Sequence, residues 1–152
     1  MIQGKASQVF INGDNVLKVF DKTQSKGYRG SGKQSYQREK ECLKRLEGNK
    51  HFPQIIKCDD DKLTIEMTYC GEIFPYDNKP RPELLSQAWE ISEALDNANI
   101  KLYGGTLQKN NILLHEGIIK LVDFEYALPE GSDLEMKKDF VNHIRRHWDQ
   151  TV

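Results

Sequence analysis

The chain has 152 residues, a length typical of one domain that buries roughly two-thirds of its unfolded surface. Charged residues make up 30% of the sequence and hydrophobic residues 38%, and this mixture argues against global disorder and against a membrane-embedded protein. Because 22 Lys and Arg nearly balance 23 Asp and Glu, the net charge indicates no nucleic-acid partner. We therefore expect a single domain over residues 1–152.

The first half of the sequence predicts a β-rich unit with one helix. Residues 8–11 and 16–20 are rich in β-branched and aromatic side chains and flank a turn sequence, which predicts a hairpin. Residues 34–46 have apolar side chains at helical spacing and predict a helix. Two further strands are predicted over residues 54–58 and 62–69, joined by an acidic turn. The helix is expected to bury one face, which consists of Tyr36, Leu43 and Leu46.

The second half predicts two helices and a second hairpin. Apolar residues recur at helical spacing over residues 83–97. Two short apolar runs, 111–114 and 118–122, flank a glycine-containing turn and predict the hairpin. A capping-box pattern at residues 132–135 predicts a final helix. Two tryptophans lie on the helical apolar stripes and are expected in the core: Trp89 and Trp148.

Asn111 and Asp123 lie at the outer ends of the predicted second hairpin. Asn111 opens one strand and Asp123 closes the other, so antiparallel pairing brings both side chains to the same end. Mg²⁺ prefers oxygen ligands and takes only one or two carboxylates from a protein when it carries nucleotide phosphates. The two residues together therefore predict a magnesium site, whereas for either residue alone capping of the hairpin end is the alternative.

Lys18 is a charged residue in an otherwise apolar strand. Burial of an unpaired ammonium group is costly, so we expect a carboxylate or a phosphate beside it. Glu39, on the predicted helix that follows, is the natural partner. The alternative is an exposed lysine on an edge strand.

The order of these residues resembles that of the protein-kinase-like superfamily. The Asp-Phe-Glu sequence at residues 123–125 looks more like the atypical branches, such as the Rio-type, small-molecule and lipopolysaccharide kinases. Five segments carry the resemblance, in the family's order: a lysine strand at 16–18, a glutamate helix at 38–43, a last first-lobe strand and hinge at 65–71, a catalytic loop at 107–114 and a metal-binding loop at 121–127.

The resemblance implies a two-lobed α+β fold. An antiparallel sheet with one helix, over about residues 1–70, would join a strongly reduced and mainly helical second lobe, over about 83–152. The hinge would lie at about 67–82, and ATP with Mg²⁺ would bind between the lobes. Lys18 and Glu39 would face the phosphates, and Asn111 and Asp123 would hold the metal.

The resemblance also implies further nucleotide contacts. The adenine base would lie against the hinge, and Gly4 is the one glycine that falls in the family's glycine-rich loop. Lys109, in the catalytic loop, would help to hold the γ-phosphate; the alternative is a solvated loop lysine. The hinge positions are Met67, Thr68, Tyr69 and Cys70.

Two departures from the family pattern bear on catalysis. The position of the catalytic aspartate is occupied by Thr106, whose hydroxyl group cannot act as a base, a role worth about 10²- to 10⁴-fold in rate. Only 29 residues follow Asp123, which we expect to hold one helix and no peptide-binding platform. We therefore predict a minimal kinase-like protein that binds Mg·ATP with at most weak phosphotransfer. The alternative is an inactive pseudokinase, a binding or regulatory module, and a protein partner or a second copy of the chain is a candidate for completing the short second lobe.

Three other patterns are expected to have ordinary structural roles. Residues 27–34 nearly spell a Walker A loop but lack its final Ser or Thr. His143 and His147 have metal-ligand spacing but no zinc-motif glutamate between them. Residues 22–50 carry nine basic against three acidic residues but no nucleic-acid-binding motif, so we expect no nucleic-acid partner.

The cysteines and the N-terminal residues indicate the cellular compartment in which the protein is expected. Cys42, Cys58 and Cys70 are widely spaced and form no Cys-x-x-Cys pair, which predicts neither a disulfide framework nor a zinc site. The first residues lack a charged region followed by an apolar core, and no stretch approaches about 18 apolar residues. We expect a cytoplasmic protein with no membrane partner.

Overall fold

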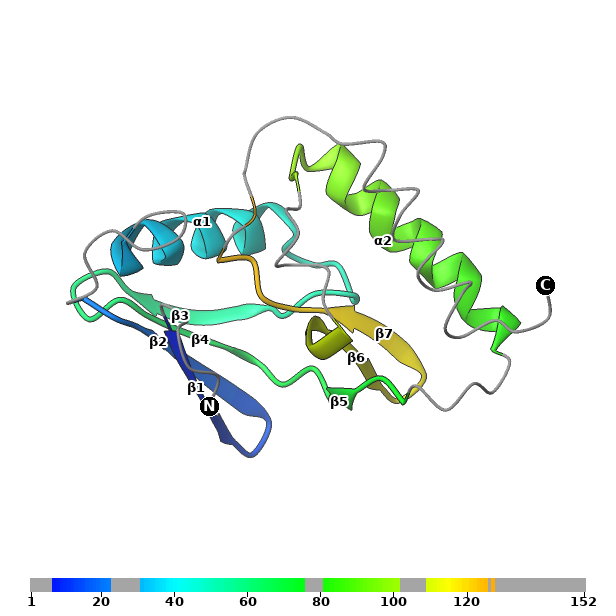
Figure 1. The fold of residues 1–152 in the computed structure, drawn as a ribbon, viewed down its shortest axis with the longest axis horizontal. Helices are drawn as coiled ribbons and strands as arrows, with labels where there is room; N and C mark the ends of the chain where they lie inside the picture. The colour runs from blue at the N-terminus through cyan, green and yellow to red at the C-terminus, as the bar shows by residue number, and fades with distance from the viewer. Residues whose placement is uncertain (1–6, 23–30, 76–80, 102–108, 126, 128–152) are drawn as a thin grey trace.

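The structure of the protein is a computed structural model that describes residues 7–22, 31–75, 81–101, 109–125 and 127 (Figure 1). Within these ranges the chain forms two antiparallel sheets and two α-helices. The α+β class predicted from the sequence is therefore confirmed. No helix in the described ranges is long and apolar enough to cross a membrane.

The first sheet has four strands and one helix on its inner face (Figure 1). Helix α1, Gly32–Arg45, contacts β2, β3 and β4 and buries Tyr36 and Leu43 as predicted. Lys18 lies on β2, which pairs on both sides, so the alternative of an edge-strand lysine is wrong. In spatial order the strands are β1, Ser7–Asn12; β2, Asn15–Phe20; β4, Thr64–Thr68; and β3, Ile55–Asp59.

Local side-chain chemistry explains the connections of this sheet. Gly13, with φ of +63°, forms the turn between β1 and β2. The Ser31 hydroxyl accepts the N–H of Gln34, whose side chain accepts the N–H of Ser31 in return, and this capping box starts α1. The Asp59 carboxylate accepts the N–H groups of Asp61 and Lys62, so the acidic triplet forms the predicted turn.

The second sheet lies beside the first and packs against α2, Leu85–Asn97 (Figure 1). A 3₁₀ turn, Pro82–Leu84, leads into α2, and a second one, Lys109–Asn111, leads into β6. Residue 72 was predicted to lie in the hinge, and β5 was not predicted because a strand of two residues shows no periodicity. In spatial order the strands are β5, Glu72–Ile73; β6, Ile112–His115; and β7, Ile118–Leu121.

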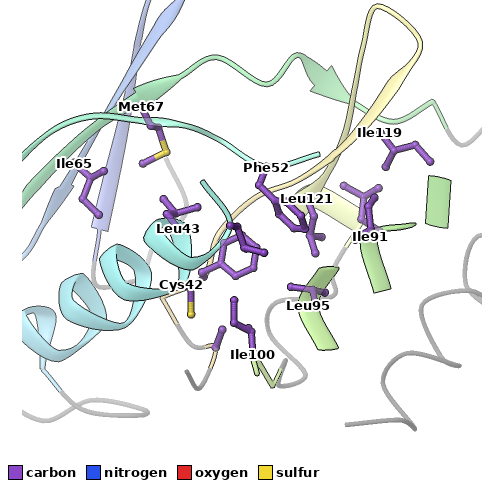
Figure 2. Close-up of a cluster of buried hydrophobic side chains, with 14 of the residues drawn as sticks. Cys42, Leu43, Phe52, Ile65, Met67, Ile91, Leu95, Ile100, Ile119 and Leu121 are labelled. Carbon is purple, nitrogen blue, oxygen red and sulfur yellow. The ribbon is translucent and has the colours of Figure 1, made fainter. Parts of the chain in front are cut away.

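One hydrophobic cluster joins the two sheets. Phe52 lies between α1 and the second sheet, and its ring contacts that of Phe124 with centroids 5.9 Å apart (Figure 2). The neighbouring His51 ties the same segment to β7, because its main-chain oxygen accepts the N–H of Leu121 at 2.9 Å. Four of the elements that contribute to the cluster are labelled in Figure 2: Cys42 and Leu43 of α1, Ile65 and Met67 of β4, Ile91 and Leu95 of α2, and Ile119 and Leu121 of β7.

Trp89 corrects one prediction. It was expected in the core, but 42% of its surface is exposed. The buried face of α2 consists of Ala88, Ile91, Ser92 and Leu95, and a residue next to Ala88 points about 100° away from that face. Trp148, the predicted final helix, residues 27–30 of the near-Walker segment and the pair His143 and His147 lie outside the described residues.

Candidate functional site

A cleft of about 520 Å³ lies between the two sheets. Its charged end is lined by Lys18 and Glu39 from the first sheet and its helix, and by Asn111 and Asp123 at one end of the second hairpin. The other end is lined mainly by apolar side chains and by the segment that leads from β4 to β5. The four residues predicted to meet around a phosphate therefore share one cleft.

Lys18 lies at the centre of the charged end. The strand register places it opposite Ile65 and Val9, on the face of the sheet that α1 covers, and only 5% of its surface is exposed. Its Nζ lies 2.6 Å from Oε2 of Glu39 and 3.2 Å from Oδ1 of Asp123. The predicted ion pair with Glu39 is thus present, and the ammonium group bridges the two halves of the molecule.

Burial and charge act on these groups in opposite directions. Burial lowers the pKa of Lys18, but the negative charges of Asp123, Glu39 and Glu125 outweigh it, so the pKa lies above its ordinary value and the ammonium group stays charged. Burial raises the pKa of Glu39 to about 7, although the ammonium group of Lys18 favours its ionised form. The neighbouring acids add to the rise.

Glu125 is a buried acidic residue that the sequence analysis did not assign to the site. It is fully buried, and its Oε2 lies 3.8 Å from Nζ of Lys18 and accepts a hydrogen bond from Ser7 Oγ at 2.8 Å. Nε of Arg38 donates to the main-chain oxygen of Glu125 at 2.7 Å. The signal in the sequence is an acidic residue between two aromatic ones, four residues after the end of β7.

Asn111 and Asp123 lie at the same end of the second hairpin, as predicted. The N–H of Val122 donates to the main-chain oxygen of Asn111 at 3.0 Å, which fixes this end. Asp123 adopts a φ of +74°, a left-handed conformation that non-glycine residues rarely take, and its carboxylate thereby reaches Lys18. Carboxylate and amide oxygens beside a cleft are ligands that fit Mg²⁺.

The predicted hinge residues Met67, Thr68, Tyr69 and Cys70 line the other end of the cleft. The N–H of Thr68 donates to the main-chain oxygen of Gln54, and that of Tyr69 to Asp14. These two N–H groups are therefore already bonded within the protein. Burial raises the pKa of the Cys70 thiol to about 11, so this group stays protonated near neutral pH.

Exposed apolar side chains form the walls of the cleft. Val9 and Ile11 of β1 are 56% and 65% exposed, and Ile73 of β5 is 53% exposed. Val9 and Ile11 alternate along the strand and so project to the same side, toward the cleft. Apolar walls of this kind fit a flat, apolar ligand surface such as a purine ring.

Three predicted site residues cannot be placed in the cleft. Gly4 and Thr106 lie outside the described residues. Lys109 begins the 3₁₀ turn that ends at Asn111, and its side chain is not among those described.

No protein-family model matches the chain, and a search of curated proteins finds none similar to it. The functional conclusion therefore depends on the geometry of the cleft and on the order of the residues in the sequence.

Proposed function

We propose that the protein binds a purine nucleoside triphosphate with Mg²⁺ in the cleft between its two sheets, as a minimal kinase-like protein. One observation carries the proposal. Nζ of Lys18 contacts Glu39 and Asp123, at 2.6 and 3.2 Å, at one end of a cleft whose other end is largely apolar. A triphosphate nucleotide has the same polarity, with a charged end and a flat apolar end.

The negative charge at the polar end of the cleft supports the proposal that the triphosphate binds together with Mg²⁺. Lys18 faces three carboxylates, those of Glu39, Asp123 and Glu125, so a bare triphosphate would meet net negative charge. When bound, Mg²⁺ would neutralise phosphate charge and share oxygen ligands with the protein. Asp123 and Asn111 are the residues proposed to hold it, and Lys18 is proposed to contact a phosphate oxygen.

The apolar end supports a purine as the base. Val9, Ile11 and Ile73 offer apolar surface on opposite sides of the cleft, and Met67 to Cys70 present main-chain groups along its edge. A purine ring needs both, because its faces are apolar and its edge carries hydrogen-bond donors and acceptors.

Phosphotransfer is proposed to be weak. Thr106 occupies the position at which the family resemblance expects an aspartate, and a neutral hydroxyl group cannot accept the proton of a substrate alcohol. This residue also favours the second candidate function, a nucleotide-binding module that transfers no phosphate.

A thermal-shift titration tests nucleotide binding. A ligand that binds the folded state stabilises it by about 2.7 kcal/mol at 100 times its Kd. We expect Mg·ATP to raise the Tm and ATP alone to raise it much less. Lys18→Met should abolish the shift, whereas Lys57→Met, at an exposed position in the same sheet, should retain it. An unchanged Tm at millimolar Mg·ATP would refute nucleotide binding.

A radiolabel assay tests transfer. If the protein transfers phosphate, Asp123→Ala should remove the label from autophosphorylated or added substrate, because it removes a proposed metal ligand. Thr106→Asp should raise the rate, by up to about 10²- to 10⁴-fold if it restores a base. Equal labelling by the wild type and Asp123→Ala would indicate a contaminating kinase, and no gain with Thr106→Asp would favour the module without transfer.

A further inference from the structure

Three carboxylates converge on a single ammonium group. One oxygen from each of Glu39, Asp123 and Glu125 lies within 4.8 Å of the other two. Glu39 and Glu125 are 1% and 0% exposed, and the side chain of Asp123 is 13% exposed. Lys18 supplies one positive charge to this cluster, and Arg38 donates to the main-chain oxygen of Glu125. The three carboxylates can thus carry more negative charge than the single ammonium group neutralises, at a position where water cannot screen it.

Glu125 provides a second, independent observation. Its Oε2 accepts the hydrogen bond from Ser7, but its Oε1 is buried and accepts none from the described residues. A buried carboxylate oxygen without a donor is costly, and buried polar groups in proteins nearly always have a partner. A cation at the cluster that binds both oxygens of Glu125 would supply that partner.

The spacing of the oxygens suits a divalent cation. Two oxygens on opposite sides of Ca²⁺ lie up to about 5 Å apart, and those across Mg²⁺ about 4.2 Å apart. The separation of up to 4.8 Å between the three oxygens accepts Ca²⁺ as it stands and requires a small contraction for Mg²⁺ or Mn²⁺. Nζ of Lys18 lies where these oxygens meet, and the adjoining cleft gives the ammonium group room to move out.

We infer that Glu39, Asp123 and Glu125 form a divalent-cation site that is filled in the absence of nucleotide, and that the ammonium group of Lys18 competes with the metal for it. This ligand set differs from the pair Asn111 and Asp123 of the proposed nucleotide site. The inference does not rest on nucleotide binding.

Mn²⁺ binding to the full chain without nucleotide is the direct test, measured by electron paramagnetic resonance and by calorimetry. We expect one Mn²⁺ per chain, displaced by Mg²⁺ or Ca²⁺. Glu125→Gln keeps the size of the side chain and removes its charge, and should weaken binding at least tenfold. Glu116→Gln, at an exposed position in the turn between β6 and β7, should bind as the wild type does.

Lys18→Met provides a test in the opposite direction. Removal of the competing ammonium group should tighten Mn²⁺ binding at least tenfold, whereas a cluster that serves only as an internal ion pair would bind no metal in either protein. Circular dichroism establishes that each variant is folded. If Glu125→Gln does not fold, the wild type and Lys18→Met decide the question by themselves.

Two results would overturn the inference: no Mn²⁺ bound by the wild type at millimolar concentration, or equal affinities for the wild type and a folded Glu125→Gln. Its failure is distinguishable from failure of the proposed function. Mn²⁺ binding without any response to Mg·ATP leaves the cation site in place, and a response to Mg·ATP without nucleotide-free Mn²⁺ binding leaves only the nucleotide site.

Discussion

Glu39 is a charged residue of α1 whose side chain is almost completely buried. It is 1% exposed and lies 2.6 Å from an ammonium group, with two further carboxylates nearby. Its pKa of about 7 means that it gains or loses a proton close to neutral pH. Protonation of this one residue therefore couples the stability of the protein to pH.

Stability should fall as the pH rises through neutrality. The folded state holds the Glu39 proton more tightly than the unfolded state, whose pKa is near 4.5. The resulting stabilisation is complete below about pH 4.5 and lost as the pH rises through about 7. Between about pH 5 and about pH 8, the free energy of unfolding of the wild type should fall by about 2 kcal/mol relative to that of Glu39→Gln, measured by urea denaturation. A difference that stays constant over this range would contradict the prediction.

Gly71 is required by both its backbone angle and its surroundings. Its φ is +95°, and a Cβ atom there would collide with the main-chain oxygen of Leu114. We expect Gly71→Ala to cost about 3 kcal/mol or more in unfolding free energy. Gly117→Ala is the matched control, because Gly117 has φ of +79° with open space around it and should cost only about 1 kcal/mol. Equal costs for the two variants would show that the contact with Leu114 is unimportant.

The sequence predicts the positions of some single residues and not those of others. A lysine in an apolar strand requires a partner, so the pair of Lys18 and Glu39 follows from the cost of burying a charge. Glu125 lies two residues after an aspartate that already suits a metal site, and the two aromatic residues beside it are a weak local sign of its burial. Trp89 was placed wrongly because an apolar stripe predicts a face of the helix but not its edges.

At the scale of elements, α1 determines where Glu39 lies. Its first turn is fixed by the capping box of Ser31 and Gln34, which satisfies main-chain N–H groups that have no partner within the helix. The predicted helix began two residues late, at residue 34, although the Ser-x-x-Gln pattern was present in the sequence. The strands β1 to β4 were predicted because each shows β-branched or alternating residues over at least four positions, whereas β5 has two residues.

Loss of the cap should weaken α1 measurably. Ser31→Ala removes the acceptor for the N–H of Gln34 and should lower the free energy of unfolding by about 1 kcal/mol. Ser86→Ala, near the start of α2, is the control, because the Ser86 hydroxyl donates to a carbonyl and caps no N–H. Its effect in chemical denaturation should be smaller. A cost for Ser31→Ala no larger than that for Ser86→Ala would mean that the capping box contributes nothing.

At the scale of the whole molecule, two sheets share one core and leave a cleft between them. Lys18 and Asp123 are separated by 105 residues, yet their charged groups lie 3.2 Å apart. Hydrophobic periodicity predicts single elements but not which sheets meet, so a shared cleft for these two residues was expected from the family resemblance and not from any local pattern. Their direct ion pair was not predicted. The position of β1 over the cleft, with Val9 and Ile11 facing it, was likewise absent from the sequence analysis.

The measurement that tests nucleotide binding in this cleft most directly is an NMR titration of the isotope-labelled full chain with Mg·ATP. Amide and methyl signals of Val9, Ile11, Met67, Leu113 and Asp123 should shift together and saturate, because these residues line the cleft on both of its sides. Signals around the second hollow, which is lined by Tyr36 and Lys40 of α1 and by Asp60 of the turn between β3 and β4, should stay unchanged. Shifts confined to that second hollow, or none at millimolar Mg·ATP, would contradict the proposed site between the sheets.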